Sequence, residues 1–300
     1  MNHPQDPGTE AGSGAGGSAA VLPGTLYVVA TPIGNLGDVT LRALEVLRSV
    51  DVIAAEDTRV TSKLLNRHGI AGRLIAVHEH NERRAAETVL GLLAGGKAVA
   101  LVSDAGTPGI ADPGARVVAA ARAAGHAVVP VPGANAAATA LSASGFEAGR
   151  FLFCGFLPSR AAERRRVLDA LVQERALLVF YETPHRIADC IADLCAVFGG
   201  AREILIAREL TKLHETLHRC RLEAAGEWLQ GDDNRRRGEF VLVVEGAPET
   251  ARDASAGAGD VLKVLLAELP LKQAVALAVK LTGGNRNELY GLALELKGEN

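Results

Sequence analysis

The stretch from Val99 to Gly114 limits the possible fold of this chain more than any other. It opens with an apolar run through Val102, whose length and β-branching are typical of a buried strand. A loop follows that holds three glycines and two prolines within nine residues, and residues 115–122 then have a helical pattern. Ligands bind at the carboxyl ends of strands in open α/β sheets, and glycine lets a backbone come close to a ligand, so this loop is a candidate ligand site.

A tight strand-to-helix turn with capping residues is the alternative interpretation of the same loop. Its length argues against a simple turn, since connections between strands and helices usually need only about 2–6 residues. The two prolines stiffen the loop, so less entropy is lost when a ligand binds. Asp104 stands where the strand ends and can accept a hydrogen bond from a hydroxyl or an amide.

Strand-like and helix-like patterns alternate along residues 24–246, with short connections between them. This alternation predicts an α/β fold with mostly parallel sheets covered on both faces. We expect two α/β domains with a cleft between them, a disordered tail rich in small residues, a linker and a small helical segment. In chain order, these parts are residues 1–23 (tail), 24–132 and 133–246 (the α/β domains), 247–260 (linker) and 261–300 (helices).

The helical segment contains Asn285-Arg286-Asn287-Glu288, which is typical of an N-cap followed by a glutamate three residues on. It is compatible with a helix-turn-helix and also with a small helical appendage, because short helical pairs are not specific to DNA binding.

Charge and composition narrow the class of protein. The net charge is −3, so there is no global attraction to nucleic acid, and any RNA contact requires a local basic patch. The four cysteines, at 154, 190, 195 and 220, form no CxxC pair, which favours reduced thiols in a cytoplasmic protein. No apolar run reaches about 18 residues, and no basic region precedes an apolar stretch at the N-terminus, so we expect neither a membrane span nor a signal peptide.

Polar clusters follow five of the expected strands. One such cluster is weak evidence, but five at successive strand ends indicate one shared cleft between the two α/β domains. Two familiar phosphate-binding patterns are excluded, because Gly96-Lys97-Ala98 lacks the Ser or Thr of the NTPase loop and the glycines at 106, 109 and 114 lack the dinucleotide spacing. The clusters are Thr31-Pro32-Ile33-Gly34-Asn35, Glu56-Asp57-Thr58-Arg59, Ser103-Asp104-Ala105-Gly106-Thr107-Pro108, Pro132-Gly133-Ala134-Asn135-Ala136 and Tyr181-Glu182-Thr183-Pro184-His185-Arg186.

On these motifs the chain resembles the tetrapyrrole methylase superfamily and, within it, the bacterial branch of ribosomal RNA small-subunit methyltransferases. The resemblance covers about residues 25–246, with a further match at residues 270–274. The Gly-Thr-Pro loop belongs to the whole superfamily, whereas the combination of motifs is specific to the ribosomal RNA branch; Ala111 and Thr183 stand where serine is common. The further motifs are Gly155-Phe156-Leu157-Pro158, Pro184-His185-Arg186, Arg208-Glu209-Leu210-Thr211-Lys212 and Gly238-Glu239-Phe240.

The resemblance implies a fold, a cofactor and an activity. It implies a tetrapyrrole methylase-like fold, with S-adenosyl-L-methionine folded in the cleft between the α/β domains, and a homodimer. The implied reaction is methyl transfer to the ribose 2′-hydroxyl of a cytidine at the decoding centre of 16S rRNA. Such a transfer is an in-line displacement, to which positioning contributes about 7–11 kcal/mol in well-oriented systems. The residues that then suit the cofactor are Thr31, Pro32, Asp104, Gly106, Thr107, Pro108, Asn135, Ala136 and Tyr181.

A 2′-hydroxyl loses its proton during the reaction, so a general base is expected in the cleft. Each candidate also has a structural interpretation, which is a helix cap for Glu56 and Asp57 and an ion pair with a nearby arginine for the others. The candidates for catalysis are Glu56, Asp57, Arg59, Glu182 and Lys212, with Glu209 as a further base.

Basic clusters, one at Arg160 and residues 164–166 and one at residues 235–237, are candidates for phosphate contact. The alternative is a solvated helix face and a charged loop. Three histidines, His78, His80 and His185, lack the spacing of a metal site, so no metal is expected. The residues predicted to contact RNA are Arg164, Arg165, Arg166, His185 and Arg186.

Two other functions are compatible with parts of the pattern. One is a methyltransferase acting on a tetrapyrrole, which requires a broad apolar cleft and no arginine clusters; residues 155–158 and 184–186 argue against it. The other is a non-catalytic RNA-binding or ribosome-assembly protein that holds the cofactor only structurally, and the sequence does not exclude it.

Overall fold

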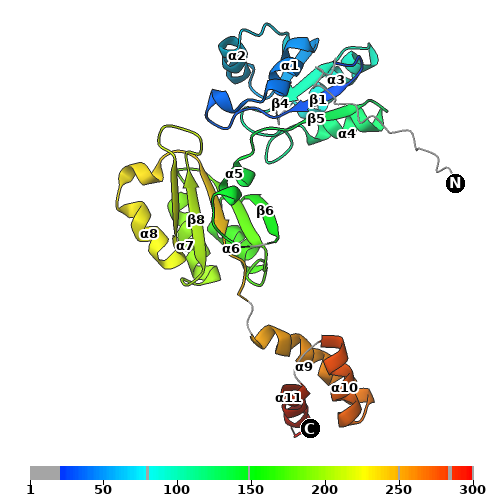
Figure 1. Cartoon of the computed structure of the whole chain (residues 1–300), viewed down its shortest axis with the longest axis vertical. Helices are drawn as coiled ribbons and strands as arrows, with labels where there is room; N and C mark the ends of the chain where they lie inside the picture. The colour runs from blue at the N-terminus through cyan, green and yellow to red at the C-terminus, as the bar shows by residue number, and fades with distance from the viewer. Residues whose placement is uncertain (1–20, 79–80, 148, 249–250, 283–285, 299–300) are drawn as a thin grey trace, which may run out of the picture. The chain divides into compact units, whose positions relative to one another are not determined.

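The computed structural model describes residues 21–78, 81–147, 149–248, 251–282 and 286–298. The chain divides into two compact units (Figure 1). The first contains the α/β part as far as Glu245 except residues 172–176, and the second contains residues 172–176 and everything from Gly246 onward. Most of the predicted tail, residues 1–20, lies outside the described residues.

The first sheet is parallel throughout, as the alternating pattern predicts, with the strand order β3-β2-β4-β1-β5. Every residue of β2 and β4 is buried, because these strands have neighbours on both sides and helices over both faces. The strands are β1 (Leu26–Val29), β2 (Val52–Ala55), β3 (Leu74–Ala76), β4 (Val99–Val102) and β5 (Val128–Val131). The helices are α1 (Leu41–Ser49), α2 (Thr58–Arg67), α3 (Glu82–Ala94) and α4 (Ala115–Ala123), with the short 3-10 helix η1 (Leu36–Asp38).

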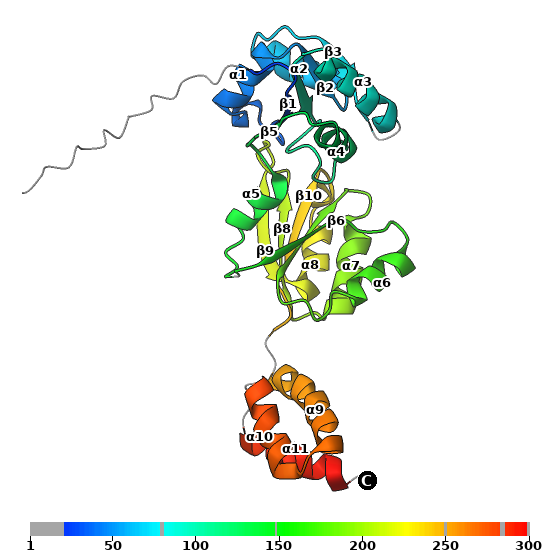
Figure 2. The same cartoon turned by 90° about the vertical axis from the view of Figure 1, so that its right-hand side faces the viewer.

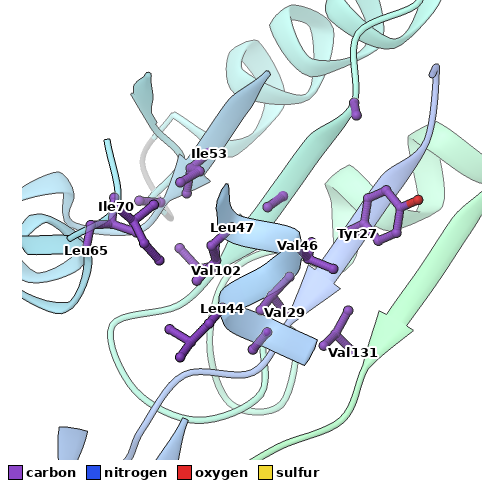
Figure 3. Close-up of a cluster of buried hydrophobic side chains, with 14 residues drawn as sticks. Tyr27, Val29, Leu44, Val46, Leu47, Ile53, Leu65, Ile70, Val102 and Val131 are labelled. Atoms are coloured by element: carbon purple, nitrogen blue, oxygen red, sulfur yellow. The ribbon is translucent and has the colours of Figure 1, made fainter. Parts of the chain in front are cut away.

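Side chains of β4 alternate between two apolar layers. Ala100 and Val102 join a cluster with the buried residues of α1 (Figure 3). Val99 and Leu101 point to the opposite face and pack against α3 and α4. Both layers fix the position of β4, and therefore of the glycine-containing loop at its carboxyl end.

The second sheet is mixed, with the order β6-β7-β10-β8-β9. Only β6 and β7 are parallel, because β10 returns antiparallel between β7 and β8, and β9 also pairs antiparallel. The prediction of a mostly parallel sheet is therefore wrong here. The strands are β6 (Phe151–Phe156), β7 (Leu177–Glu182), β8 (Glu203–Arg208), β9 (Thr216–Arg221) and β10 (Phe240–Val244).

Helix α5 packs on one face of this sheet through Ala137 and Ala140, against apolar side chains of β7, β8 and β10. Helices α6, α7 and α8 pack in sequence against one another. Figure 2 shows α5 and these helices beside the strands. The helices are α5 (Ala136–Ser142), α6 (Ala161–Asp169), α7 (Ile187–Phe198) and α8 (Leu222–Gln230), with the 3-10 helix η2 (Asp233–Arg236).

In the described residues from Gly246 onward, the second unit has three helices, α9 (Ala251–Glu268), α10 (Leu271–Thr282) and α11 (Arg286–Gly298). They pack around a core that includes Leu262, Val275 and Leu289. The linker predicted over 247–260 differs from the structure, since α9 begins at Ala251. Its alanine content explains the helix, because alanine has the strongest helix propensity. The predicted N-cap Asn285 lies outside the described residues. Within those residues, no helix is long and apolar enough to span a membrane.

Candidate functional site

A cavity of about 210 Å³ lies in the first unit, where β4 and β7 end and the antiparallel β10 begins. Six residues predicted for the site line it: Gly106, Thr107, Asn135, Ala136, Tyr181 and Glu182. Four of the five polar clusters therefore contribute to one cavity, whereas the cluster at residues 56–59 contributes no lining residue. The lining residues not predicted are Ile33, Ala105, Ile110, Asp112, Phe156, Thr183, Leu210, Glu239, Phe240 and Val241.

Thr31 holds the glycine loop from behind. Its backbone amide donates to the Gly106 carbonyl at 2.8 Å, the Gly106 amide donates back at 3.0 Å, and its hydroxyl donates to the Ser103 carbonyl. Thr31 is buried, so it positions the loop and does not line the cavity. Pro32, Asp104 and Pro108 also lie outside the cavity lining.

Gly106 has a φ of +77°, a left-handed conformation that side chains disfavour. A Cβ at this position would lie 3.4 Å from Cγ2 of Ile33, which itself lines the cavity. The absence of a side chain keeps the backbone accessible at this wall, so the residue type fits close approach by a ligand.

Tyr181 joins the other half of the cavity wall to α5. Its hydroxyl accepts a hydrogen bond from the Ala137 amide at 3.2 Å, and its ring makes edge contacts with Phe153 and Phe156. Burial raises the pKa of the Tyr181 phenol above its usual value. The side chain of Asn135 caps α5 by accepting from the Ala138 amide at 3.0 Å. Asn135 and Tyr181 therefore have structural roles besides lining the cavity.

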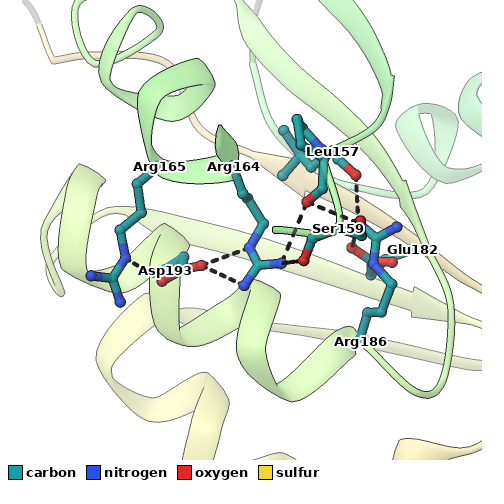
Figure 4. A network of polar contacts seen from close by, with 8 residues as sticks. Leu157, Ser159, Arg164, Arg165, Glu182, Arg186 and Asp193 are labelled. Atoms are coloured by element: carbon teal, nitrogen blue, oxygen red, sulfur yellow. Dashed lines mark hydrogen bonds and ion pairs between the residues drawn. The ribbon is translucent and has the colours of Figure 1, made fainter. Parts of the chain in front are cut away.

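Glu182 is one of the predicted catalytic candidates, and the alternative interpretation, an ion pair with a nearby arginine, is confirmed. Its buried carboxylate accepts from the Thr183 amide at 2.8 Å and from Arg186 at 3.2 Å. The Arg186 guanidinium also donates to the carbonyls of Leu157 and Pro158, so this ion pair joins β7 to the end of β6 (Figure 4).

Three acidic residues are linked where β2 and β4 end. The Asp104 amide donates to Glu56 at 3.2 Å, and the Asp57 amide donates to Asp104 at 2.9 Å. Hydrogen bonds from Arg59 lower the pKa of Asp57 to about 2, and Asp57 also caps α2. The helix-cap and ion-pair interpretation is therefore confirmed for Asp57 and Arg59. Burial raises the pKa of Glu56.

Asp112 is one of two acidic lining residues that the sequence argument missed, the other being Glu239, which binds Lys212. Burial and the nearby negative charge of Glu56 raise the pKa of Asp112 to about 6. A hydrogen bond from Ser103 lowers this pKa, but its effect is smaller. The preceding Ala111 has a φ of +64°, and backbone strain of this kind concentrates at functional sites. Its place at the end of the glycine-containing loop was the available sequence signal.

A second strained segment borders the cavity at residues 209–212. Lys212 binds Glu209 at 2.8 Å and Glu239 at 2.7 Å. Burial alone lowers the pKa of Lys212, but these two carboxylates outweigh it and raise the pKa. The ion-pair interpretation of Lys212 is therefore confirmed, and the raised pKa favours its protonated form. The hydroxyl of Thr211, which has a φ of +66°, accepts from the Asn35 amide, so the segment contacts the first half of the unit.

Comparison with known proteins places this geometry in a family. The model of the tetrapyrrole (corrin/porphyrin) methylases matches residues 25–226, and that of the RsmI C-terminal HTH domain matches residues 252–297. A ribosomal RNA small subunit methyltransferase I of Escherichia coli O157:H7 is 52% identical over 92% of this chain and 96% of its own length. A ribosomal RNA small subunit methyltransferase I of Pseudomonas aeruginosa is 50% identical over 92% of this chain and 99% of its own length. The chain belongs to the ribosomal RNA small subunit methyltransferase I family of tetrapyrrole methylases.

Solved structures agree with this family in fold. The methyltransferase CobJ superposes with a TM-score of 0.57 at 20% identity, covering 74% of this chain and 94% of that one. The cobalt precorrin-4 methyltransferase CbiF gives 0.54 at 15% identity, covering 73% and 94%. These similarities show that the two-sheet architecture is that of the tetrapyrrole methylases.

The arginines predicted to bind RNA do not share one environment in this family member. Arg164 is buried and binds Asp193 of α7 (Figure 4). The prediction that Arg164 contacts RNA is therefore wrong, because its guanidinium is not accessible to a phosphate. Arg165 binds the other oxygen of the same carboxylate but stays largely exposed. Arg166 and His185 are exposed. In the second basic cluster, Arg235 stacks over Trp228 and Arg236 binds Asp233.

Metal ligands were not expected from the sequence. Among the described residues, no group of three or more His, Cys, Asp or Glu side chains is placed to hold a metal ion. His80 lies outside those residues. None of the four cysteines forms a disulfide.

Proposed function

We propose that the protein transfers a methyl group from S-adenosyl-L-methionine to the ribose 2′-hydroxyl of a cytidine at the decoding centre of 16S rRNA. The observation that carries this proposal is the cavity that Gly106 lines with accessible backbone. It lies in a chain that is about half identical to two ribosomal RNA small subunit methyltransferases I. The relatives' names support ribosomal RNA as substrate class, and the family supports methyl transfer.

The cavity fits this cofactor in its chemistry. Apolar side chains of Ile33, Ile110 and Leu210 suit the adenine ring and the methionine chain, and the backbone of Gly106 and Thr107 suits polar groups. S-adenosylmethionine supplies an electrophilic methyl group on a sulfonium. The chain's own contribution is to hold the two reactants in line and to exclude water, which is the larger part of catalysis for such a displacement.

The decisive experiment is methylation of purified 30S subunits and of free 16S rRNA with radiolabelled S-adenosylmethionine. We expect label in the RNA, and 2′-O-methylcytidine after digestion to nucleosides. Label on a base, or none, contradicts the proposal. The same assay with a uroporphyrin-type tetrapyrrole tests the alternative substrate, and binding of 30S subunits without transfer supports a non-catalytic role.

We further propose a cytoplasmic homodimer whose RNA contacts include exposed basic side chains. Arg165, Arg166 and His185 are the predicted RNA residues that are exposed. The dimer follows from the family resemblance, and sedimentation at micromolar concentration tests it: a monomer mass contradicts it.

A further inference from the structure

Four ionisable side chains line the cavity, and two of the three carboxylates among them are held in ion pairs. Glu182 accepts hydrogen bonds from Thr183 and Arg186, and Glu239 binds Lys212. Tyr181 accepts from the Ala137 amide, and burial raises the pKa of its phenol, so it stays protonated at neutral pH. The fourth is Asp112, which accepts a hydrogen bond from Ser103 and has no ion pair among the described residues.

The backbone around Asp112 fixes where its carboxylate lies. Ala111 is held in the left-handed region, which costs an alanine about 1–2 kcal/mol. On the other side, the buried carboxylate of Glu82 accepts hydrogen bonds from the amides of Gly114 and Arg116, at 2.9 and 3.1 Å. This anchoring holds the segment in the strained conformation and keeps Asp112 at the cavity wall.

The groups that face Asp112 come from three elements. Glu56 follows β2, Ser103 and Asp104 follow β4, and Tyr181 lies on β7. None of them is a cation, so none holds the carboxylate in an ion pair. A carboxylate in such surroundings has a greater affinity for a proton than an ordinary aspartate, which is the property required of a general base near neutral pH.

We propose that Asp112 is the general base that removes the proton from the ribose 2′-hydroxyl. This inference rests on the proposed function. The O2′–H bond breaks and its proton passes to an oxygen of Asp112, while a lone pair of O2′ forms the bond to the methyl carbon. The carbon–sulfur bond of the donor breaks, and its electron pair stays on sulfur, which becomes a neutral thioether. The products are the methylated ribose, S-adenosylhomocysteine and protonated Asp112.

Glu56 has a separate role as a positioning residue. Its charge acts on Asp112, and its carboxylate also accepts a hydrogen bond from the Asp104 amide at 3.2 Å. Glutamine at position 56 keeps an oxygen for that amide but removes the charge. The expected result is a lower pKa at Asp112, which gives the proposal a measurable signature besides loss of activity.

The experiment compares wild type, Asp112→Asn, Glu56→Gln and Asp51→Asn. Asp51 precedes β2 at the end opposite Glu56 and binds Lys97, so its variant is the matched control. We expect Asp112→Asn to lower kcat on 30S subunits by about 10²–10⁴-fold, with S-adenosylmethionine affinity retained in calorimetry. The wild-type rate rises with pH through about 6, the Glu56→Gln profile is displaced to lower pH, and the Asp51→Asn profile matches wild type.

A readout that needs no turnover is the carboxyl carbon resonance of Asp112, followed by NMR as a function of pH in wild type and in Glu56→Gln. We expect its midpoint near 6 in wild type and lower in the variant. Asp112→Asn with a wild-type rate on 30S subunits overturns the role of Asp112 alone. A loss of cofactor affinity as large as the loss of rate also overturns it, since Asp112 is then a cofactor ligand. A wild-type protein that transfers no methyl group overturns the proposed function, and the role of Asp112 with it.

Discussion

Arg164 and Asp193 form a buried ion pair between α6 and α7, with side chains only 4% and 3% exposed. The Nε and Nη2 atoms of Arg164 both lie 2.6 Å from Oδ2 of Asp193, and Arg165 binds Oδ1 at the same distance (Figure 4). One residue of an apparently uniform arginine run thus belongs to the domain core, while its neighbours face solvent. The run combines a structural and a surface role.

Replacing Arg164 with Ala is expected to destabilise the fold by about 3–5 kcal/mol, because it leaves a buried carboxylate only partly paired. Arg166→Ala is the control, with a change within about 0.5 kcal/mol. Burial raises the pKa of Asp193, but the two arginines outweigh it and lower the pKa. The stabilisation is therefore present above the unfolded pKa and is lost as pH falls through the folded one. Urea unfolding at pH 7 and pH 3 tests this, and an equal loss at both contradicts it.

The surface members of the same run are expected to bind RNA. Each phosphate contact releases counterions, so it contributes about −0.7 to −0.9 to the slope of log K against log salt. Arg165→Ala combined with Arg166→Ala should weaken 30S binding and flatten that slope. The control removes the same charge from Arg83 and Arg84, an exposed adjacent pair on α3. Equal effects of the two double variants would mean that net charge alone matters.

The glycine loop is expected to require Gly106 for cofactor binding. Gly106→Val places a branched side chain at the cavity wall beside Ile33, so S-adenosylmethionine affinity should be lost in calorimetry. Valine at any position with a positive φ also strains the backbone. Gly125→Val controls for this, because Gly125 has a φ of +80° and open space around it. Both variants should lose stability, but only Gly106→Val should lose binding. Unchanged affinity in Gly106→Val would show that the cofactor binds elsewhere.

Local sequence is sufficient to predict strands that are buried on both faces and the glycine-containing loop that follows β4. β4 could be predicted because a strand buried on both faces is apolar at every position, and Gly106 and Thr107 could be placed at its carboxyl end. The sequence pattern does not predict β9, because β9 is an edge strand with exposed Leu217, Arg219 and Arg221. The antiparallel course of β10 depends on pairing between distant segments, which periodicity does not report.

The chemistry of individual side chains depended on contacts between distant parts of the chain. Arg164 and Arg166 are equivalent in sequence, and only the packing of α7 distinguishes them. Lys212 is a possible base until Glu209 and Glu239 are placed beside it. Asp112 gains its raised pKa from burial and from Glu56, which the fold brings to the same sheet edge.

Asp112 is expected to reduce stability at neutral pH. Its pKa is about 6 in the folded protein against 3.8 as the ordinary value, so its favourable contribution is complete below pH 3.8 and is lost as pH rises through 6. That shift corresponds to about 3 kcal/mol at most, and solvent screening reduces it to about 1–2 kcal/mol. Asp112→Asn cannot ionise, so it should be more stable than wild type at pH 8 by that amount and nearly equal to it at pH 4.

Asp57 offers a control of opposite sign on the same sheet edge. Hydrogen bonds from Arg59 lower the pKa of Asp57 to about 2. The stabilisation of the fold by the Asp57 carboxylate is therefore present above the unfolded pKa and is lost as pH falls through 2. Asp57→Asn should therefore be less stable than wild type at pH 8, and the difference should shrink in acid. Denaturant unfolding from pH 3 to 8 distinguishes the two residues. If the curve for Asp112→Asn runs parallel to that of wild type, the carboxylate is not held at a raised pKa, and the acid limb expected for methyl transfer must come from another group.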